Sequence, residues 1–374
     1  MDTTMLISLI VEIILVWSVL TAVQFPLRKA EHRLVGSIVF LVKLILIPVV
    51  ALLFVGIDWV VPYNHGEILC AAYIALIGDV AASLVEYIVR RLMARRNADD
   101  GSHHRYDYRV GMSIGLAVCF AMLAFATVNA ETMKMDTHEW QADGLEQEHT
   151  FAFTADMHAG SSMSMDALRD FCKQVNDSDA EFLILGGDVT DEKTSYEEMV
   201  ETYEILSSVD IPVFFVFGNH DRQPRADLVG GRTYTDGQLL TEIEGAGITI
   251  LADDYVQVAG DLVLLGREDI SAGDARKDWS ELVNPYGGAL IVADHQPYDR
   301  DQLDVEISAL QLSGHTHAGQ LWPLHFVYDL LGLPVCGEYD RPGTRLYVTP
   351  GTGGWAPLLR TEAQSGWELI TLRP

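Results

Sequence analysis

The sequence predicts a bundle of about four membrane-spanning helices in residues 1–130, followed by an α/β domain in residues 148–374. All the long apolar stretches of the 374-residue chain lie in the first part. Residues 1–130 contain 10 acidic and 10 basic residues, whereas residues 131–374 contain 43 and 15 and therefore hold the whole net charge of −28. From residue 148 onward, short apolar runs alternate with amphipathic stretches, as in α/β domains. The polar residues 131–147 are expected to form a linker.

Four apolar stretches of the first part reach the length of about 20 residues that a helix needs to cross a bilayer. They lie near residues 5–23, 34–56, 67–89 and 110–129. The first stretch does not read as a cleavable signal peptide, because an acidic residue precedes it and the basic residues follow it. The sequence thus predicts a multi-pass protein of the cell membrane, with the lipid bilayer as its partner.

The charges between these stretches indicate an orientation. Basic residues number three in the first connection, none in the second and six in the third: Arg28, Lys29 and Arg33, then Arg90, Arg91, Arg95, Arg96, Arg105 and Arg109. Positive connections stay in the cytoplasm. We therefore expect the N-terminus and the α/β domain to lie outside the cytoplasm. Glu12, Lys43 and Asp79 lie inside the spans, where charges are often functional. A structural ion pair of Lys43 with Asp79 is favoured over a transport path, because nothing else in the sequence resembles one.

The second part alternates predicted strands with two predicted helices. The strands are expected at 149–155, 181–186, 211–217, 247–251, 261–266, 288–293, 308–313, 344–349 and 366–372, and the helices at 163–176 and 194–208. Several strands end in polar clusters, and ligand sites gather at the carboxyl ends of strands in such sheets. In order, the clusters are Asp156-Met157-His158, Gly187-Asp188-Val189-Thr190-Asp191, Gly218-Asn219-His220-Asp221, Asp294-His295 and Gly314-His315-Thr316-His317.

These clusters supply carboxylates, imidazoles and one amide oxygen but no thiolate, which suits Mn²⁺, Fe, Zn²⁺ or Mg²⁺. In the Asp-x-His and His-x-His pairs, two side chains of one extended segment point to the same face, so each pair can hold one ion. Seven candidate ligands exceed the needs of one tetrahedral ion and fit two ions that share a carboxylate. Two such ions are the usual apparatus for in-line displacement at phosphorus.

The five motifs, in this order, resemble the calcineurin-like metallophosphoesterase superfamily over residues 148–374. The run Gly314-His-Thr-His-Ala-Gly-Gln320, the later Tyr347–Gly353 and the apolar N-terminal part are similar to the bacterial transmembrane branch of that superfamily. The resemblance implies a four-layer αββα sandwich and two divalent metal ions, with Mn or Zn favoured. Some members of the branch are associated with lipid substrates such as UDP-diacylglucosamine.

The resemblance also implies a role for each site residue. The first metal would be held by Asp156, His158, Asp188 and His317, and the second by Asp188, Asn219, His295 and His315, with Asp188 as the bridge. His220 would protonate the leaving oxygen. Asp191 or Asp221 would orient His220, and Asp191 is favoured. Ala155 and Ala318 depart from the residues usual beside the motifs, but neither removes a ligand.

The expected function is hydrolysis of an anionic phosphoester or pyrophosphate, with a lipid-linked substrate favoured. A phosphodiesterase for a soluble substrate and a catalytically silent receptor or scaffold are the alternatives. Nucleic acid is not expected as a partner, because the acidic domain would repel its phosphates. The apolar residues 321–333 follow the last motif directly. They form either ordinary core or a rim for an acyl chain.

Overall fold

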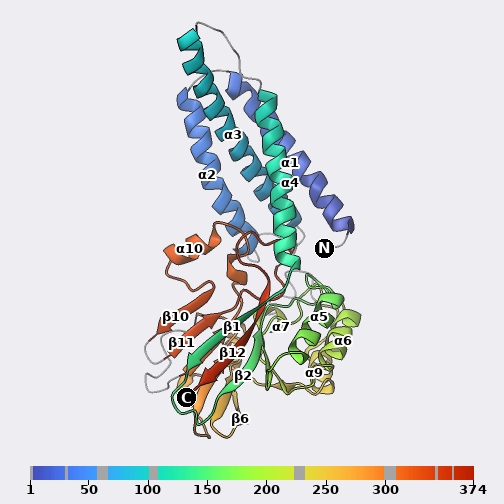
Figure 1. Cartoon of the computed structure of the whole chain (residues 1–374). Helices are drawn as coiled ribbons and strands as arrows, with labels where there is room; N and C mark the ends of the chain where they lie inside the picture. Colours follow the sequence, from blue (N-terminus) through green and yellow to red (C-terminus); the bar gives the residue numbers. More distant parts are fainter. Residues whose placement is uncertain are drawn as a thin grey trace. The chain divides into compact units, whose positions relative to one another are not determined.

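The computed structural model describes residues 3–29, 33–56, 66–100, 108–222, 232–298, 309–341, 344–355 and 358–374. The chain forms two compact units (Figure 1). One comprises Met1–Val128 and Leu321–Leu324, and the other comprises Asn129–Gln320 and His325–Pro374. Each is described below by itself.

The first unit is built from four helices. They are α1 (Thr3–Lys29), α2 (Arg33–Gly56), α3 (Gly66–Asp100) and α4 (Tyr108–Glu131). In the described residues, the segments Ile68–Arg96 and Arg109–Glu131 are long and apolar enough to cross a membrane. The apolar segments described in α1 and α2 are shorter, Ile7–Thr21 and Ile38–Leu53. Two of the four expected spans thus meet the length criterion over their described residues.

Helices α3 and α4 approach each other at two glycines. A Cβ atom on Gly78 would lie 2.6 Å from the carbonyl oxygen of Gly115, and one on Gly115 would lie 2.7 Å from that of Gly78. Small residues allow such close contact between helices in membrane proteins. Between α2 and α3, Lys43 Nζ lies 2.6 Å from Asp79 Oδ2, so the expected ion pair is present.

The second unit contains two six-stranded sheets. The first has the order β1-β12-β2-β3-β4-β5 and the second the order β10-β11-β9-β8-β7-β6. The strands of the first sheet are β1 (Lys134–Gln141), β2 (His149–Thr154), β3 (Leu183–Leu185), β4 (Val213–Phe215), β5 (Thr249–Ile250) and β12 (Gly366–Arg373). Those of the second are β6 (Asp254–Ala259), β7 (Leu262–Gly266), β8 (Ala289–Ala293), β9 (Ala309–Ser313), β10 (Gly337–Arg341) and β11 (Thr344–Val348).

Helices cover the outer face of the first sheet (Figure 1). They are α5 (Met165–Asn176), α6 (Tyr196–Leu206) and α9 (Asp236–Gly245). Each begins at a side chain that caps the free backbone N–H groups of its first turn, namely Ser164, Ser195 and Thr235. The shorter helical segments are α7 (Asn219–Arg222), α10 (Leu324–Leu330), η3 (Ile270–Ala275), η4 (Trp279–Glu281) and η5 (His317–Gly319).

Two apolar cores hold these layers together. The core between the helices and the first sheet includes Phe171, Met199 and Trp367. The core between the two sheets includes Phe153 and Ile291, one from each sheet. The expected sandwich of sheets is therefore confirmed. On the outer face of the second sheet, the described cluster is completed by Tyr255, Trp279 and Leu282 rather than by an α-helix of the expected fourth layer.

The expected linker is in part a strand. Residues 134–141 form β1, which pairs in parallel with β12 from Lys134↔Gly366 to Gln141↔Arg373. As an edge strand, β1 buries mainly Trp140, so its sequence lacks the apolar alternation of the other strands. The elements β6, β10, α9 and the short helices were likewise not predicted, whereas every predicted strand is present within a few residues.

Candidate metal centre

The expected site residues follow five strands of the second unit. In the first sheet, β2, β3 and β4 run parallel, and in the second sheet β8 and β9 do so. Asp156 and His158 follow β2, Asp188 follows β3, and Asn219 opens α7 just after β4. His295 follows β8, while His315 and His317 follow β9. The carboxyl ends of parallel strands thus bring together side chains that lie up to 161 residues apart in the chain.

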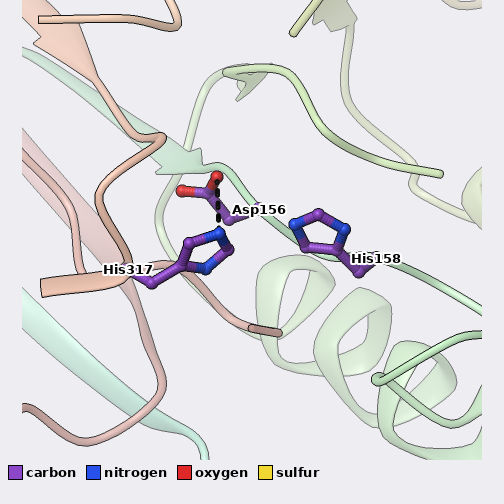
Figure 2. Close-up of side chains that lie close together, drawn as sticks. All are labelled: Asp156, His158 and His317. Carbon is purple, nitrogen blue, oxygen red and sulfur yellow. Dashed lines mark ion pairs between the residues drawn. The ribbon is translucent and has the colours of Figure 1, made fainter. Parts of the chain in front are cut away.

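Asp156, His158 and His317 form one triad with the spacing of a metal site. Their ligand atoms lie within 4.8 Å of one another, and all three side chains are buried. Figure 2 shows the Asp156 carboxylate directed at the His317 ring, with the His158 ring across from them. The distance from His317 Nε2 to Asp156 Oδ1 is 3.8 Å.

Asp188, His295 and His315 form a second triad with the same spacing. His295 Nε2 lies 3.0 Å from Asp188 Oδ2 and 3.9 Å from Asp156 Oδ1. Asp188 Oδ2 also lies 4.0 Å from His158 Nε2 of the first triad. Asn219 joins the second triad, because its Oδ1 lies 2.8 Å from His315 Nδ1. All seven expected ligands are therefore in one place, and Asp188 lies between the two triads.

The histidine rings are fixed by their outer nitrogens. His158 Nδ1 lies 3.1 Å from Asp191 Oδ2, and His295 Nδ1 donates to the carbonyl of Gly186 at 2.8 Å. Such contacts set the tautomer and leave Nε2 free to bind a metal. Ser161 Oγ also donates to Asp191 Oδ2, at 2.6 Å.

Four buried atoms of the two triads form no hydrogen bond among the described residues, although two of them, His295 Nε2 and Asp188 Oδ2, face each other as an ion pair at 3.0 Å. The four atoms are His158 Nε2, Asp188 Oδ2, His295 Nε2 and His317 Nδ1. A buried polar atom without a partner costs roughly 1–3 kcal/mol. Four such atoms on neighbouring side chains, all nitrogen or carboxylate oxygen, suit divalent cations. The residues present therefore fit a pair of metal ions.

The backbone of the triads is strained. Asp156, His158, Asp188, His315 and His317 all have positive φ angles, between 47° and 73°. Non-glycine residues adopt this region rarely, at a cost of roughly 1–3 kcal/mol each. Strain of this kind persists where the surrounding structure enforces it, typically at functional sites.

Two glycines of the motifs are required by close contacts. A Cβ on Gly218 would lie 2.1 Å from Asp188 Oδ1, and one on Gly314 would lie 2.5 Å from Asp156 Oδ2. Both contacts are far shorter than a side chain tolerates, so these positions admit the carboxylates only when they are glycine.

His220 lies beside the first triad, with its ring centroid 5.0 Å from that of His158. Its Nδ1 contacts the carboxylate of Glu192 at 2.8 Å. The expectation that Asp191 or Asp221 orients His220 is not met by this geometry. Asp191 is engaged with His158, and Asp221 accepts the backbone N–H groups of Asp188, Gly218 and Thr190. Glu192, which follows Asp191 directly, takes the place expected for them because its longer side chain reaches the ring.

Two further residues stabilise the surroundings. Arg222 pairs with Glu268 and stacks on Phe217, with 3.5 Å between its guanidinium carbon and the ring centroid. Gln320 accepts from the backbone N–H of Trp355 at 2.9 Å and donates to its carbonyl at 2.7 Å. These two hydrogen bonds connect the loop after His317 to the loop after β11.

The electrostatics separate the histidines of the centre. Burial lowers the pKa of His317 well below its usual value, and the charge of His158 lowers it further. Burial also acts to lower the pKa of His220, but Glu192, then Asp188, raises it well above the usual value. Burial would raise the pKa of Asp188, yet the charges of His295 and His220 hold it well below its usual range. Burial and the neighbouring charges thus favour the neutral form of His317, the protonated form of His220 and the ionised form of Asp188.

Comparison with known proteins identifies relatives of this domain. Residues 149–319 match the family model of the calcineurin-like phosphoesterases. An uncharacterised metallophosphoesterase of Helicobacter pylori is 29% identical over 243 residues, which cover 62% of this chain and 62% of that protein. A Danio rerio transmembrane protein with a metallophosphoesterase domain is 29% identical over 59% of this chain and 52% of its own length. The Escherichia coli phosphodiesterase YaeI is 26% identical over 54% and 74%, respectively.

The matched segment contains most of the centre. It begins at the first residue of β2 and ends just after His317, so it includes both triads, Asn219 and His220. The chain spans less than two thirds of the length of the Helicobacter relative. The segment that holds these triads, residues 149–319, is thus similar to the calcineurin-like phosphoesterases.

Proposed function

We propose that this chain is a membrane-anchored phosphoesterase that uses two divalent metal ions to hydrolyse a phosphoester or pyrophosphate bond. The observation that carries the proposal is the pair of buried Asp/His triads, in which four ligand atoms form no hydrogen bond among the described residues. They lie in the segment that is similar to the calcineurin-like phosphoesterases, and a silent receptor would have no need to keep them.

The residues divide between two ions. The first ion would be held by Asp156, His158 and His317, and the second by His295, His315 and Asn219. Asp188 would bind both, because its Oδ2 faces His158 and His295 from 4.0 and 3.0 Å. When bound, two divalent ions activate water for attack at phosphorus and offset the charge of the phosphoryl oxygens.

His220 would supply the proton for the leaving group. Glu192 accepts a hydrogen bond from Nδ1–H of His220, so the proton on Nε2 remains available to the leaving group. As the bond between phosphorus and the leaving oxygen breaks, that oxygen takes the proton from Nε2. Glu192 then keeps the neutral ring in place. Asp191 would act on the metal side instead, by fixing the His158 ring.

Activity can be tested on the whole chain in detergent. The protein is stripped of metal, reloaded with Mn²⁺ or Zn²⁺, and assayed with bis(p-nitrophenyl) phosphate and p-nitrophenyl phosphate. We expect turnover that requires metal and stops when EDTA is added. A protein that binds two ions but turns over neither ester, nor nucleotide, sugar-nucleotide or phospholipid esters, would favour the receptor or scaffold.

Membrane anchoring through four spans extends the proposal. Two segments are apolar and long enough to cross a bilayer, and the Danio rerio relative is named a transmembrane protein. The alternation of basic connections supports a catalytic domain outside the cytoplasm. Single cysteines at residue 98 and at the exposed Asp143 can be probed on cells with an impermeant thiol reagent. Labelling at 143 only is expected, and labelling at 98 only would reverse the orientation.

A lipid-linked substrate is the favoured class. Helix α10 begins seven residues after His317, and it exposes Phe326 and Leu330 to 67% and 76%. Large apolar side chains that are exposed together mark binding surfaces. The acidic domain also gives a freely diffusing anion no electrostatic steering, whereas a substrate confined to the membrane needs none.

The substrate class can be tested with matched variants. Phe326→Ala and Leu330→Ala should lower kcat/KM on a phospholipid in mixed micelles and leave a small chromogenic diester unaffected. Val283→Ala is the control, because Val283 is 76% exposed elsewhere in the domain. Equal losses on both substrates would point to a soluble phosphoester.

A further inference from the structure

Arg360 is a fully buried cation whose hydrogen bonds, among the described residues, all go to backbone carbonyls. The guanidinium reaches the carbonyls of His317, Pro350, Gly351 and Gly353. Burying a charge is costly unless hydrogen bonds satisfy it. An arginine in this position therefore has a role that outweighs the cost.

The four carbonyls belong to two loops that touch the first triad. His317 is itself a member of the triad. The loop 350–353 packs against Asp156, because Gly353 N–H donates to the Asp156 carbonyl at 2.9 Å. A Cβ on Gly351 would lie 2.8 Å from Asp156 Cβ. Arg360 thus ties the segment that carries His317 to the segment that supports Asp156.

The backbone around Arg360 is held in turn by the end of α4. Asn129 Nδ2 lies 3.2 Å from the carbonyl oxygens of Arg360 and Glu362 and 3.4 Å from that of Ala363. Ser365 Oγ donates to the carbonyl of Ala130 at 2.7 Å. Asn129, Ala130 and residues 360–365 belong to the same compact unit as the triads. A continuous set of contacts therefore joins the last turn of α4 to the loop beside Asp156.

We infer that Arg360 is a positioning residue for the first triad and that Asn129 fixes Arg360 in place. Asp156 and His317 both hold a positive φ, at 55° and 48°, and such a backbone relaxes unless its surroundings enforce it. The planar guanidinium offers five donors in a fixed fork, which a lysine lacks. This inference rests on the two-ion site of the proposed function, and it concerns how tightly the first ion is bound.

The test measures metal binding without any substrate. The metal-free full chain in detergent is titrated with Mn²⁺ by calorimetry, and the bound metal is counted by elemental analysis. Arg360→Met and Arg360→Lys should weaken one of the two binding steps by roughly 10–100-fold, the usual effect of residues that support metal ligands. Asn129→Ala should weaken the same step by less. Arg345→Met is the control, because Arg345 is a partly exposed arginine beside Asp340 and Trp140.

Two reference variants identify the step. The step that Arg360→Met weakens should be the one lost in His317→Ala and kept in His315→Ala. Equal weakening of both steps, or unchanged binding with a lower unfolding temperature alone, would overturn the inference. Should Arg360→Met fail to fold, Arg360→Lys and Asn129→Ala decide the matter by the same comparison.

A failure of the inference about Arg360 can be distinguished from a failure of the proposed activity. A wild-type chain that binds two Mn²⁺ ions yet hydrolyses no phosphoester would refute the activity and leave the role of Arg360 standing. A wild-type chain that is active, with Arg360 variants that bind Mn²⁺ as tightly, would refute the role of Arg360 and leave the activity standing.

Discussion

Both units of this protein bury charged side chains, but they do so in different ways. In the helical unit, the side chains of Lys43 and Asp79 are 7% and 1% exposed, and Lys43 Nζ contacts both Asp79 Oδ2 and Ser83 Oγ. In the α/β unit, the titratable residues His158 and His317 are 0% and 5% exposed, yet each keeps a ring nitrogen without a hydrogen bond among the described residues. Burial of a charge is thus no sign of function by itself. The sign is a group of such atoms on neighbouring Asp and His side chains, because together they mark ligand positions.

The largest expected effect comes from the carboxylate between the triads. Asp188→Asn should reduce turnover below detection and lower the bound metal, because an amide cannot bridge two cations as a carboxylate does. Elemental analysis and the diester assay measure both effects. Asp261→Asn is the matched control, since Asp261 pairs with His149 away from the triads. Full activity of Asp188→Asn would remove the two-ion assignment.

The second largest effect is expected at His220, which is proposed to act as the general acid and not as a metal ligand. His220→Ala should lower kcat by roughly 10²–10⁴, the usual contribution of a general acid, and keep both metals. The loss should be greater for an alkyl ester than for a nitrophenyl ester, because the better leaving group needs less protonation. If the variant loses metal, His220 is a ligand and not the acid.

The ion pair between Lys43 and Asp79 in the helical unit should contribute to stability and not to activity, unlike the triads. Lys43→Met leaves Asp79 buried without its cation and should destabilise the protein by roughly 3–5 kcal/mol. Replacing both, as in Lys43→Met with Asp79→Leu, should restore most of the stability. Thermal unfolding in detergent measures both variants. Loss of activity in a double variant that remains folded would show that this pair is functional, and the contrast between the units would fail.

Glu192 is expected to matter less than His220. Glu192→Gln removes the charge beside Nδ1 but keeps an acceptor, so kcat should fall by about 10–100-fold with KM unchanged, the size of a hydrogen bond to a charged group. Combining it with His220→Ala should add almost nothing, because Glu192 acts through that ring. Additive losses in the double variant would give Glu192 a separate role.

The smallest effect should come from His149, which lies between Glu181 and Asp261 at 2.9 and 2.8 Å. Burial acts to lower the pKa of His149, but these two carboxylates raise it above its usual value. Its stabilisation is then complete below about pH 6.5 and disappears as the pH rises through the raised pKa. His149→Gln should lower the unfolding temperature by more at about pH 6 than at about pH 9. His325→Gln at a more exposed site is the control, and a difference independent of pH would contradict the charge on His149.

The sequence predicted the ligands far better than their supports. Asp156, His158 and His317 lie in short motifs whose spacing carries the information. Glu192 and Arg360 have no such motif, because their partners depend on how far a side chain reaches between loops that are distant in the chain. Motif spacing alone therefore favours Asp191 over Glu192 as the residue that orients His220. Similarly, β1 escaped prediction because an edge strand that buries mainly Trp140 has no apolar pattern to detect.

The position of β1 has a practical consequence for isolating the catalytic domain. A fragment that begins at residue 148, where the polar segment ends, would lack β1 and leave the edge of β12 unpaired. Unpaired edges invite aggregation. It would also lack Asn129 and Ala130, which bind residues 360–365. A fragment that begins at Asn129 retains β1 and the contacts of Asn129 and Ala130. An isolated domain should therefore start within the last turn of α4 rather than after the end of that helix.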